Sequence, residues 1–223
     1  MVVRWLTLLR NLDWLLSTTN SAAEWDKRYS ASEQVWSLGP NQFVERELSH
    51  LAAGKAVDLA GGEGRNAIWL AKRGWMVENI DISRVAIERF LARAESEGLA
   101  TNTVGTVADA RSARFSAKPD LVVINYLQLE FRDLAKALSN AADQLAPGGM
   151  LFGVWHSRRN LVEGYGGPQL PELNPEPSQL QVWAKESGFE CEVREIIREV
   201  RVGESVKTAW DVQIKAKRPT KSQ

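Results

Sequence analysis

Between residues 55 and 155 the sequence alternates short apolar runs with longer segments of helical periodicity. This order predicts a parallel β-sheet with helices on both faces, because successive parallel strands need a crossover connection and a helix usually provides it. The expected strands are 55–60, 75–80, 102–108, 120–125 and 150–155, and the expected helices are 66–73, 83–97 and 131–145. A further helix at 178–187, with capping-box spacing between Ser178 and Gln181, precedes two alternating segments at 190–202 and 205–217. These last segments predict an antiparallel C-terminal hairpin, which completes a doubly wound α/β sheet of seven strands.

Composition indicates one globular domain, expected at residues 23–217. Of the 223 residues, 44% are hydrophobic and 25% are charged, and Lys plus Arg equals Asp plus Glu at 28 each. The zero net charge argues against nucleic acid as a partner, because no overall field attracts phosphate. Cys191 is the only cysteine and His50 and His156 are the only histidines, so no disulfide within the chain and no metal site built on thiolates or histidines are expected, although carboxylates could hold magnesium. A cytoplasmic location suits such a chain.

Residues 1–22 are expected to form a helical extension outside the main domain. Apolar residues recur there at helical spacing, while Arg4, Arg10 and Asp13 interrupt the run that a membrane span needs. The pattern predicts a helix that packs on this subunit or on a second copy in a homodimer, with binding to a membrane surface as the alternative. At the other end, residues 218–223 are expected to be a disordered tail. Residues 160–177 read as a long loop.

A glycine-rich segment, 58–66, joins the first expected strand to the first expected helix. Glycines allow the backbone to approach a ligand closely, and the helix that follows offers free N–H donors at its start. In a doubly wound sheet this loop lies at the edge where ligands bind. The segment therefore predicts a nucleotide-like ligand.

Two acidic residues narrow the choice of ligand. Asp81 ends the second expected strand, 23 positions after Asp58, where a carboxylate accepts hydrogen bonds from ribose hydroxyls. Asp58 precedes the glycines, where its charge would repel a pyrophosphate but suits the ammonium and sulfonium groups of S-adenosylmethionine. A dinucleotide-dependent oxidoreductase is the less favoured alternative, because residues 60–64 do not supply its G-x-G-x-x-G pattern.

The segment 58–64 resembles the first motif of class I S-adenosylmethionine-dependent methyltransferases, acid-x-Gly-x-Gly-x-Gly, with Ala60 in place of the first glycine. Four later segments resemble the subsequent motifs of that class in order: 79–83, 107–110, 120–126 and 145–149. Residues 62–66 and 25–29 are similar to the tellurite-resistance and thiopurine methyltransferase-like branch. The resemblance implies a Rossmann-like fold and transfer of a methyl group from S-adenosylmethionine.

The resemblance also implies which residues contact the cofactor. Asp58, Ala60, Gly62 and Gly64 would line its methionine part, Gly61 would add room, Asp81 would hold the ribose, Ile82 would cover the adenine, Asp109 and Ala110 would contact its edge, Asn125 would lie under the sulfonium, and Trp25, Tyr29 and Trp36 would form an N-terminal cover. Arg65 and Asn66 begin a helix, where a cation is unfavourable, which indicates a carboxylate partner such as that of the cofactor. A salt bridge from Arg65 to Glu63 is the alternative.

The acceptor is expected at the same edge of the sheet. His156 and Tyr126 are candidate catalytic residues, although a lone histidine is more often structural. Candidates for an acceptor pocket are Tyr126, Gln128, His156, Arg158 and Tyr165. The resemblance favours a small, soft nucleophile, so a small-molecule acceptor is expected, for which a base is optional. A non-catalytic protein of the same fold that binds the cofactor or dimerises is the other alternative.

Overall fold

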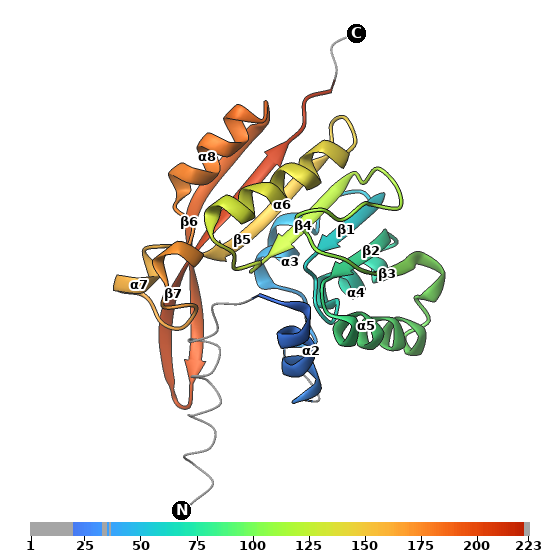
Figure 1. Ribbon diagram of the computed structural model, residues 1–223, viewed down its shortest axis with the longest axis horizontal. Coiled ribbons are helices and arrows are strands. Elements are labelled where there is room, and N and C mark those ends of the chain that lie inside the picture. Colours follow the sequence, from blue (N-terminus) through green and yellow to red (C-terminus); the bar gives the residue numbers. More distant parts are fainter. Residues whose placement is uncertain (1–19, 33–34, 36, 221–223) are drawn as a thin grey trace, which may run out of the picture.

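The computed structural model describes residues 20–32, 35 and 37–220, and a seven-stranded sheet forms their centre (Figure 1). The strand order is β3-β2-β1-β4-β5-β7-β6. The strands are β1 (Lys55–Leu59), β2 (Met76–Asp81), β3 (Thr103–Val107), β4 (Leu121–Asn125), β5 (Met150–His156), β6 (Glu190–Val202) and β7 (Ser205–Lys217). The predicted Rossmann-like sheet of seven strands is confirmed, with each strand within two residues of its expected bounds.

Strands β1 to β5 are parallel, and their carboxyl ends form one edge of the sheet. Strand β7 runs antiparallel to β5, from Met150 opposite Lys217 to His156 opposite Asp211. The hairpin of β6 and β7 continues beyond the end of β5, as far as Val202 opposite Ser205, and projects from the sheet (Figure 1). Asp211 is thereby placed at the edge where the parallel strands end.

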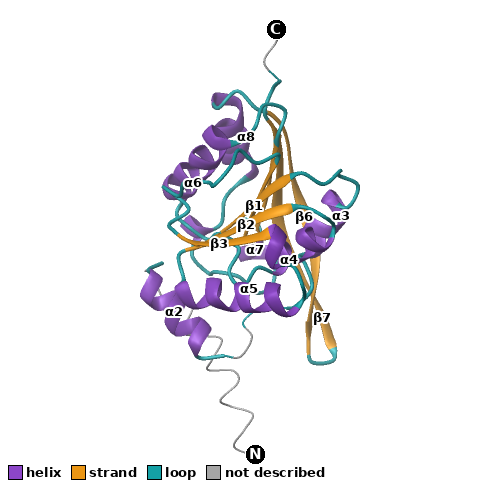
Figure 2. Cartoon of the chain, turned by 90° about the vertical axis from the view of Figure 1, so that its right-hand side faces the viewer, coloured by secondary structure: helices purple, strands orange, loops and turns teal. Residues whose placement is uncertain are grey.

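Helices cover both faces of the sheet, and each face has its own apolar core (Figure 2). One core contains α6 (Phe131–Gln144) and α8 (Pro177–Glu186), and the other contains α3 (Gln42–Leu48), α4 (Arg65–Lys72) and α5 (Arg84–Ser96). Strand residues feed the two cores alternately, because successive side chains of a strand point to opposite faces. Leu59 and Val57 lie in the first core, and Ala56 lies in the second.

The start of α8 differs from the expectation. The helix begins at Pro177, and its capping box joins Glu176 to Gln179 instead of Ser178 to Gln181. Proline suits the first helical position, because its missing N–H would have no partner there and its φ is already helical. The prediction of this cap was therefore wrong by two residues.

The sequence patterns did not anticipate several short helices. These are α2 (Ala22–Ser30), α3, α7 (Asn160–Glu163) and the 3-10 turns η2 (Ala100–Asn102) and η3 (Pro171–Leu173). The longest of them, α2, is only nine residues long and starts with a capping box between Ser21 and Glu24. Helices of two turns carry too little periodicity to be distinguished from loops.

Most of the predicted N-terminal extension, residues 1–19, lies outside the described residues. The expected disordered tail needs a correction at Arg218, whose guanidinium donates to the carbonyl oxygens at the end of α6, Ala142 and Leu145 among them. This contact satisfies carbonyls that a helix end leaves without partners, so the chain is anchored up to that point. In the described part of the chain, no helix combines the length and apolarity that crossing a bilayer requires.

Candidate active site

The glycine loop between β1 and α4 is shaped by two features of its backbone. Ala60 has a φ of +58°, which residues with a Cβ rarely adopt and which glycine adopts without strain. A Cβ on Gly61 would lie 2.0 Å from Asn79 Oδ1 and 2.7 Å from Asp58 Cγ, so the loop can pass over these side chains only as glycine. The loop therefore lies directly on the ends of β1 and β2.

Asp81 anchors this loop from the end of β2. Its Oδ2 accepts a hydrogen bond of 2.8 Å from the Gly62 N–H, and its Oδ1 accepts one of 2.9 Å from the Ser83 N–H. Burial raises the pKa of Asp81 to about 6, against the lowering effect of these two N–H donors. The side chain lines the pocket with acceptor capacity to spare, as a residue that holds ribose hydroxyls requires.

Asp58 is fully buried behind Gly61 and does not itself line the pocket among the described residues. Its Oδ2 accepts from the Ala67 N–H in the first turn of α4, whereas its Oδ1 has no hydrogen-bond partner. Burial raises the pKa of Asp58 to about 7, although the Ala67 N–H and the charge of Arg65 lower it. Asp58 can therefore act on a cationic ligand only through the field behind the loop.

Arg65 and Asn66, which the sequence predicts to contact the cofactor, both line the pocket. The Asn66 Oδ1 accepts from the Asn41 N–H at 2.9 Å, which ties α4 to the start of α3. Glu63 pairs with Arg89 at 2.8 Å, so the alternative salt bridge from Glu63 to Arg65 is not the one formed. Arg65 instead reaches Ser37 Oγ at 3.2 Å.

Asp109 and Ala110 line the pocket beside Ile82. Asp109 is engaged by Arg111, whose Nη2 lies 2.6 Å from Asp109 Oδ2, and this contact lowers the pKa of Asp109. A carboxylate already paired with a guanidinium has less capacity for an adenine amino group. Sequence reasoning missed Arg111, and the spacing of two residues from Asp109 in a turn gave no signal for the pair.

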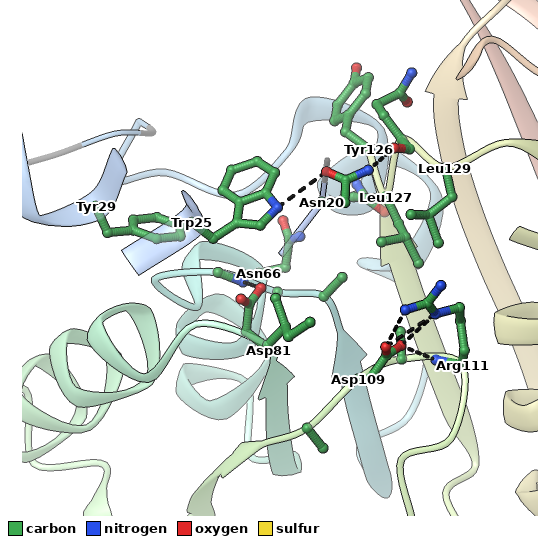
Figure 3. A pocket seen from close by; sticks show the side chains of 18 of the residues that line it. Asn20, Trp25, Tyr29, Asn66, Asp81, Asp109, Arg111, Tyr126, Leu127 and Leu129 are labelled. Atoms are coloured by element: carbon green, nitrogen blue, oxygen red, sulfur yellow. Dashed lines mark hydrogen bonds and ion pairs between the residues drawn. The ribbon is translucent and has the colours of Figure 1, made fainter. Parts of the chain in front are cut away.

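An N-terminal cover is formed by α2 and Asn20, which lies two residues before it (Figure 3). Trp25 and Tyr29 line the pocket with ring centroids 5.9 Å apart, and Trp25 Nε1 donates to Asn20 Oδ1. Asn20 in turn donates to the Gln128 carbonyl oxygen at 2.8 Å, which links the cover to the opposite wall. Trp36, the third predicted aromatic residue, lies outside the described residues.

The opposite wall is a segment of five residues that begins with the last residue of β4. Its members all line the pocket: Asn125, Tyr126, Leu127, Gln128 and Leu129. The Asn125 side-chain amide is buried, and neither its nitrogen nor its oxygen has a hydrogen-bond partner. Buried polar groups in native proteins are nearly always paired, so these two atoms indicate a place where a ligand completes the hydrogen bonds.

The remaining predicted acceptor residues lie away from this pocket. The His156 ring packs against the Tyr126 ring, with centroids 4.9 Å apart, and Gly167 lies next to the imidazole. Arg158 pairs with Glu176 at 3.1 Å, and Tyr165 is exposed in the loop after α7. Together with Asp58 and Gly64, these three are not among the described lining residues. Their predicted roles stay untested.

The described pocket also contains residues that sequence reasoning did not name: Asn20, Ala108, Arg111, Leu127 and Leu129. Leu127 and Leu129 are two positions apart in the sequence. Apolar residues at this spacing could have predicted a second apolar side of the pocket. Among the described residues, no group of three or more His, Cys, Asp and Glu is placed to hold a metal ion.

Comparison with known proteins gives a family match for the centre of the chain. Residues 56–149 match the methyltransferase domain family. The tRNA 5-carboxymethoxyuridine methyltransferase of Escherichia coli strain K12 is 26% identical over 170 residues, which are 67% of this chain and 65% of the relative. The ribosomal RNA small subunit methyltransferase C of Alcanivorax borkumensis is 31% identical over 141 residues, 61% of this chain and 40% of the relative. The chain thus spans less than two thirds of the length of these curated relatives.

Solved structures share the fold over most of the chain. A protein from a study of the conversion of a disulfide bond into a thioacetal group during echinomycin biosynthesis has a TM-score of 0.72 and 20% identity, covering 91% of this chain and 93% of its own. A SAM-dependent methyltransferase from Methanosarcina mazei has a TM-score of 0.62 and 18% identity, with coverages of 81% and 99%. TehB from Haemophilus influenzae has a TM-score of 0.64 and 17% identity, with coverages of 87% and 67%.

The relatives overturn one expectation from the sequence. A partner other than nucleic acid was predicted, with a small molecule as the acceptor, whereas both curated relatives are named for RNA substrates. A net charge of zero does not exclude such a partner, because an enzyme that modifies one nucleoside needs cations only where the RNA lies and not over its whole surface.

The family match covers most of the residues that line the described pocket. The matched residues 56–149 include the glycine loop, Asp81, Asp109 and the wall after β4. S-adenosylmethionine is the cofactor of this class, and the dinucleotide-dependent oxidoreductase considered from the layer order is set aside. The family match over residues 56–149, together with the seven-stranded fold shared with a SAM-dependent methyltransferase from Methanosarcina mazei, makes this chain similar to class I S-adenosylmethionine-dependent methyltransferases.

Proposed function

We propose that this protein transfers the methyl group of S-adenosylmethionine to a nucleoside of an RNA. The observation that carries the proposal is one continuous pocket with two chemically different sides. One side consists of the glycine loop with Asp81 and Ile82, and the other is the wall of residues 125–129. A donor and an acceptor that must meet for direct transfer need such a shared space.

The glycine-loop side suits the cofactor. Asp81 offers carboxylate oxygens to the ribose, and Ile82 offers an apolar surface to the adenine. Asp81, whose pKa is about 6, places negative charge beside the loop at neutral pH, which favours the sulfonium and ammonium groups. When bound, S-adenosylmethionine supplies an electrophilic methyl carbon that is already activated.

The opposite wall suits a planar nucleobase. The Asn125 amide has one unpaired donor group and one unpaired acceptor group, and a side-chain amide can bond to two adjacent positions on the edge of a base. Leu127 and Leu129 give apolar surface for a ring that leaves its stack. Support for RNA as the source of that base comes from the two curated relatives.

The chain's own residues then have to align the acceptor and exclude water. Trp25 and Tyr29 cover the pocket from α2, and their link through Asn20 to Gln128 closes one side of it. Burial, followed by the charge of Asp211, raises the pKa of Tyr126 well above its usual range. At neutral pH its hydroxyl is therefore a hydrogen-bond donor, which favours a role in binding over that of a base.

The test is methyl transfer to defined RNA fractions. The purified protein is incubated with methyl-tritiated S-adenosylmethionine and either tRNA or ribosomal RNA from cells that lack the gene. The RNA is then digested, and the labelled nucleoside is identified by mass spectrometry. We expect label in one nucleoside of one fraction, at a yield that saturates near one methyl group per RNA.

Two variants serve as controls. Asp81→Ala should abolish labelling, whereas Asp143→Ala, an exposed aspartate in α6, should leave it unchanged. Absence of label from both fractions, with S-adenosylhomocysteine still bound, would reject RNA as the acceptor and favour the non-catalytic alternative.

Three narrower expectations stay predictions. Membership of the tellurite-resistance and thiopurine methyltransferase-like branch has no support beyond the shared fold with TehB. The homodimer through the N-terminal extension and the cytoplasmic location are likewise untested.

A further inference from the structure

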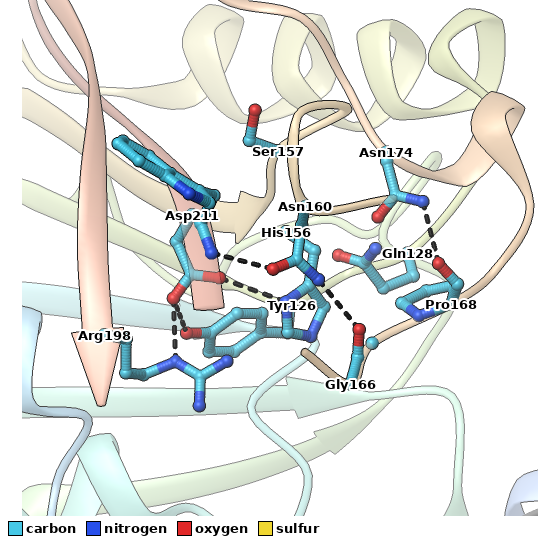
Figure 4. A network of polar contacts seen from close by, with 12 residues as sticks. Tyr126, Gln128, His156, Ser157, Asn160, Gly166, Pro168, Asn174, Arg198 and Asp211 are labelled. Carbon is cyan, nitrogen blue, oxygen red and sulfur yellow. Dashed lines mark hydrogen bonds and ion pairs between the residues drawn. The ribbon is translucent and has the colours of Figure 1, made fainter. Parts of the chain in front are cut away.

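A buried carboxylate lies behind the acceptor wall and gathers three polar side chains (Figure 4). Asp211 is fully buried on β7, and its Oδ2 accepts hydrogen bonds of 2.8 Å from the Tyr126 hydroxyl and of 2.8 Å from Arg198 Nε. The third side chain is His156, whose Nδ1 lies 3.0 Å from Asp211 Oδ1. Asp211 and its three partners come from four different strands or strand ends, so only the fold brings them together.

The charge of this cluster is well defined. Burial alone would raise the pKa of Asp211, but the contacts with His156 and Arg198 hold it below its usual range. Asp211 is therefore an ionised carboxylate compensated by the Arg198 guanidinium.

Tyr126 connects the cluster to the pocket. Its φ is +56°, in the left-handed region that a bulky residue rarely adopts, and its N–H donates to the Val154 carbonyl oxygen at 2.8 Å. Such a conformation persists only where the surroundings hold it. The hydroxyl bond to Asp211 fixes the far end of the side chain, so Tyr126 is held at both ends.

The direction of the acceptor wall depends on this residue. Tyr126 follows Asn125 at the end of β4 and precedes the other wall residues, Leu127 to Leu129. If the left-handed turn relaxed, the extended chain after β4 would leave in another direction, and the Asn125 amide and Leu127 would no longer face the same pocket. Other hydrogen bonds hold the later part of the wall, from Trp155 Nε1 to the Leu127 carbonyl oxygen at 3.0 Å and from Gln128 Nε2 to the Leu173 carbonyl oxygen at 2.8 Å, so what the hydroxyl of Tyr126 holds is the turn itself.

We propose that Asp211 is a positioning residue for the acceptor: through the Tyr126 hydroxyl it holds the turn that aims residues 125–129 into the pocket. The role in acceptor binding rests on the proposed function. His156 packs on the Tyr126 ring and contacts the same carboxylate, which makes it a support of this anchor. Arg198 keeps the carboxylate charged without contributing to the pocket among the described residues.

The first test separates acceptor binding from cofactor binding. Tyr126→Phe removes only the hydroxyl, and Asp211→Asn removes the charge with little change in size. With the RNA fraction that the wild-type protein labels, both should raise KM for RNA at least about fivefold, while KM for S-adenosylmethionine and the Kd of S-adenosylhomocysteine stay within about twofold. Asp143→Asn is the matched control and should change none of these quantities.

These measurements test the positioning role of Asp211 even if one variant misfolds. Asp211→Asn leaves Arg198 without its buried counter-charge, so it is the variant at risk, whereas Tyr126→Phe keeps the carboxylate and its other partners. Unaltered KM for RNA in Tyr126→Phe would overturn the proposal. Equal losses of cofactor affinity and acceptor affinity would also overturn it, because they would mean a general structural role.

A second measurement does not need an acceptor. Amide hydrogen exchange, followed by mass spectrometry of peptides, compares residues 125–129 with the glycine loop at residues 60–64. Tyr126→Phe should accelerate exchange severalfold in the first segment and leave the second unchanged. If the wild-type protein labels no RNA, only the proposed function is rejected. The positioning role of Asp211 is rejected if Tyr126→Phe leaves the exchange of residues 125–129 unchanged.

Discussion

The carboxylate of Asp81 accepts a hydrogen bond of 2.8 Å from the backbone N–H of Gly62, which joins the end of β2 to the glycine loop after β1. The same carboxylate lines the pocket. A carboxylate can accept about four hydrogen bonds, and Asp81 accepts two from the protein. Asp81 can therefore hold the loop in shape and still accept hydrogen bonds from the ribose.

Replacement of Asp81 should weaken cofactor binding strongly. Asp81→Ala removes the acceptor of the Gly62 and Ser83 N–H groups and that of the ribose, and hydrogen bonds to charged groups contribute about 1.5–3 kcal/mol each. The Kd of S-adenosylhomocysteine, measured by calorimetry at pH 7.5, should rise about 10- to 100-fold. Asp143→Ala should leave it within about twofold, and an unaltered Kd in a folded Asp81→Ala protein would refute the assignment.

The buried carboxyl Asp58 should make the free protein less stable as the pH rises. Burial raises its pKa from 3.8 to about 7, so between these values the folded chain keeps a proton that the unfolded chain has lost. The folded state then binds more protons than the unfolded state, and the free energy of unfolding falls with increasing pH. Each pKa unit corresponds to about 1.4 kcal/mol.

Melting curves between pH 5 and pH 8 test this relationship. Asp58→Asn removes the titrating group but keeps its size, so the Tm of this variant relative to wild type should increase as the pH rises. Asp143→Asn, which changes an exposed carboxyl, should show a constant difference. A constant difference for Asp58→Asn as well would contradict the raised pKa of Asp58.

The sequence predicted those parts of the fold whose residues form a recognisable pattern within a short stretch of chain. Strand β1 and the loop after it were found because a buried strand is apolar and because Gly61 and Gly62 are unusual in a row. Helix α3 was missed, since its seven residues give barely two turns of periodicity.

The anchor behind the acceptor wall had no local signal at all. Asp211 is one polar residue in an alternating strand and looks exposed from its neighbours, yet it is fully buried. Its burial is tolerated because Tyr126 and Arg198, distant in sequence, supply donors. Only the order of the strands, with β7 placed between β5 and β6, brings these residues together.

An added methyl group at Gly61 should disrupt the loop. In Gly61→Ala the new Cβ would lie 2.0 Å from Asn79 Oδ1, and Asn79 cannot turn away without losing its hydrogen bond to the Gly62 carbonyl oxygen. Overpacking of this kind costs about 1–3 kcal/mol, and the Tm should fall by several degrees. In Gly39→Ala the Cβ meets nothing within 4 Å, so its Tm should stay near wild type, and equal melting temperatures for both variants would disprove the close approach.

Loosening α2 should speed the release of cofactor. Asp26 Oδ1 accepts from Ser83 Oγ at 2.6 Å and from the Val85 N–H at 3.2 Å, so α2 caps the start of α5 while Trp25 covers the pocket. A lost cap costs about 1 kcal/mol, so Asp26→Ala should raise the dissociation rate of S-adenosylhomocysteine about fivefold in a stopped-flow displacement experiment. Lys27→Ala, at the exposed next position of α2, should leave that rate unchanged. If both substitutions accelerated release equally, the effect would come from the helix as a whole, and the contact between Asp26 and α5 would not be what holds the cover in place.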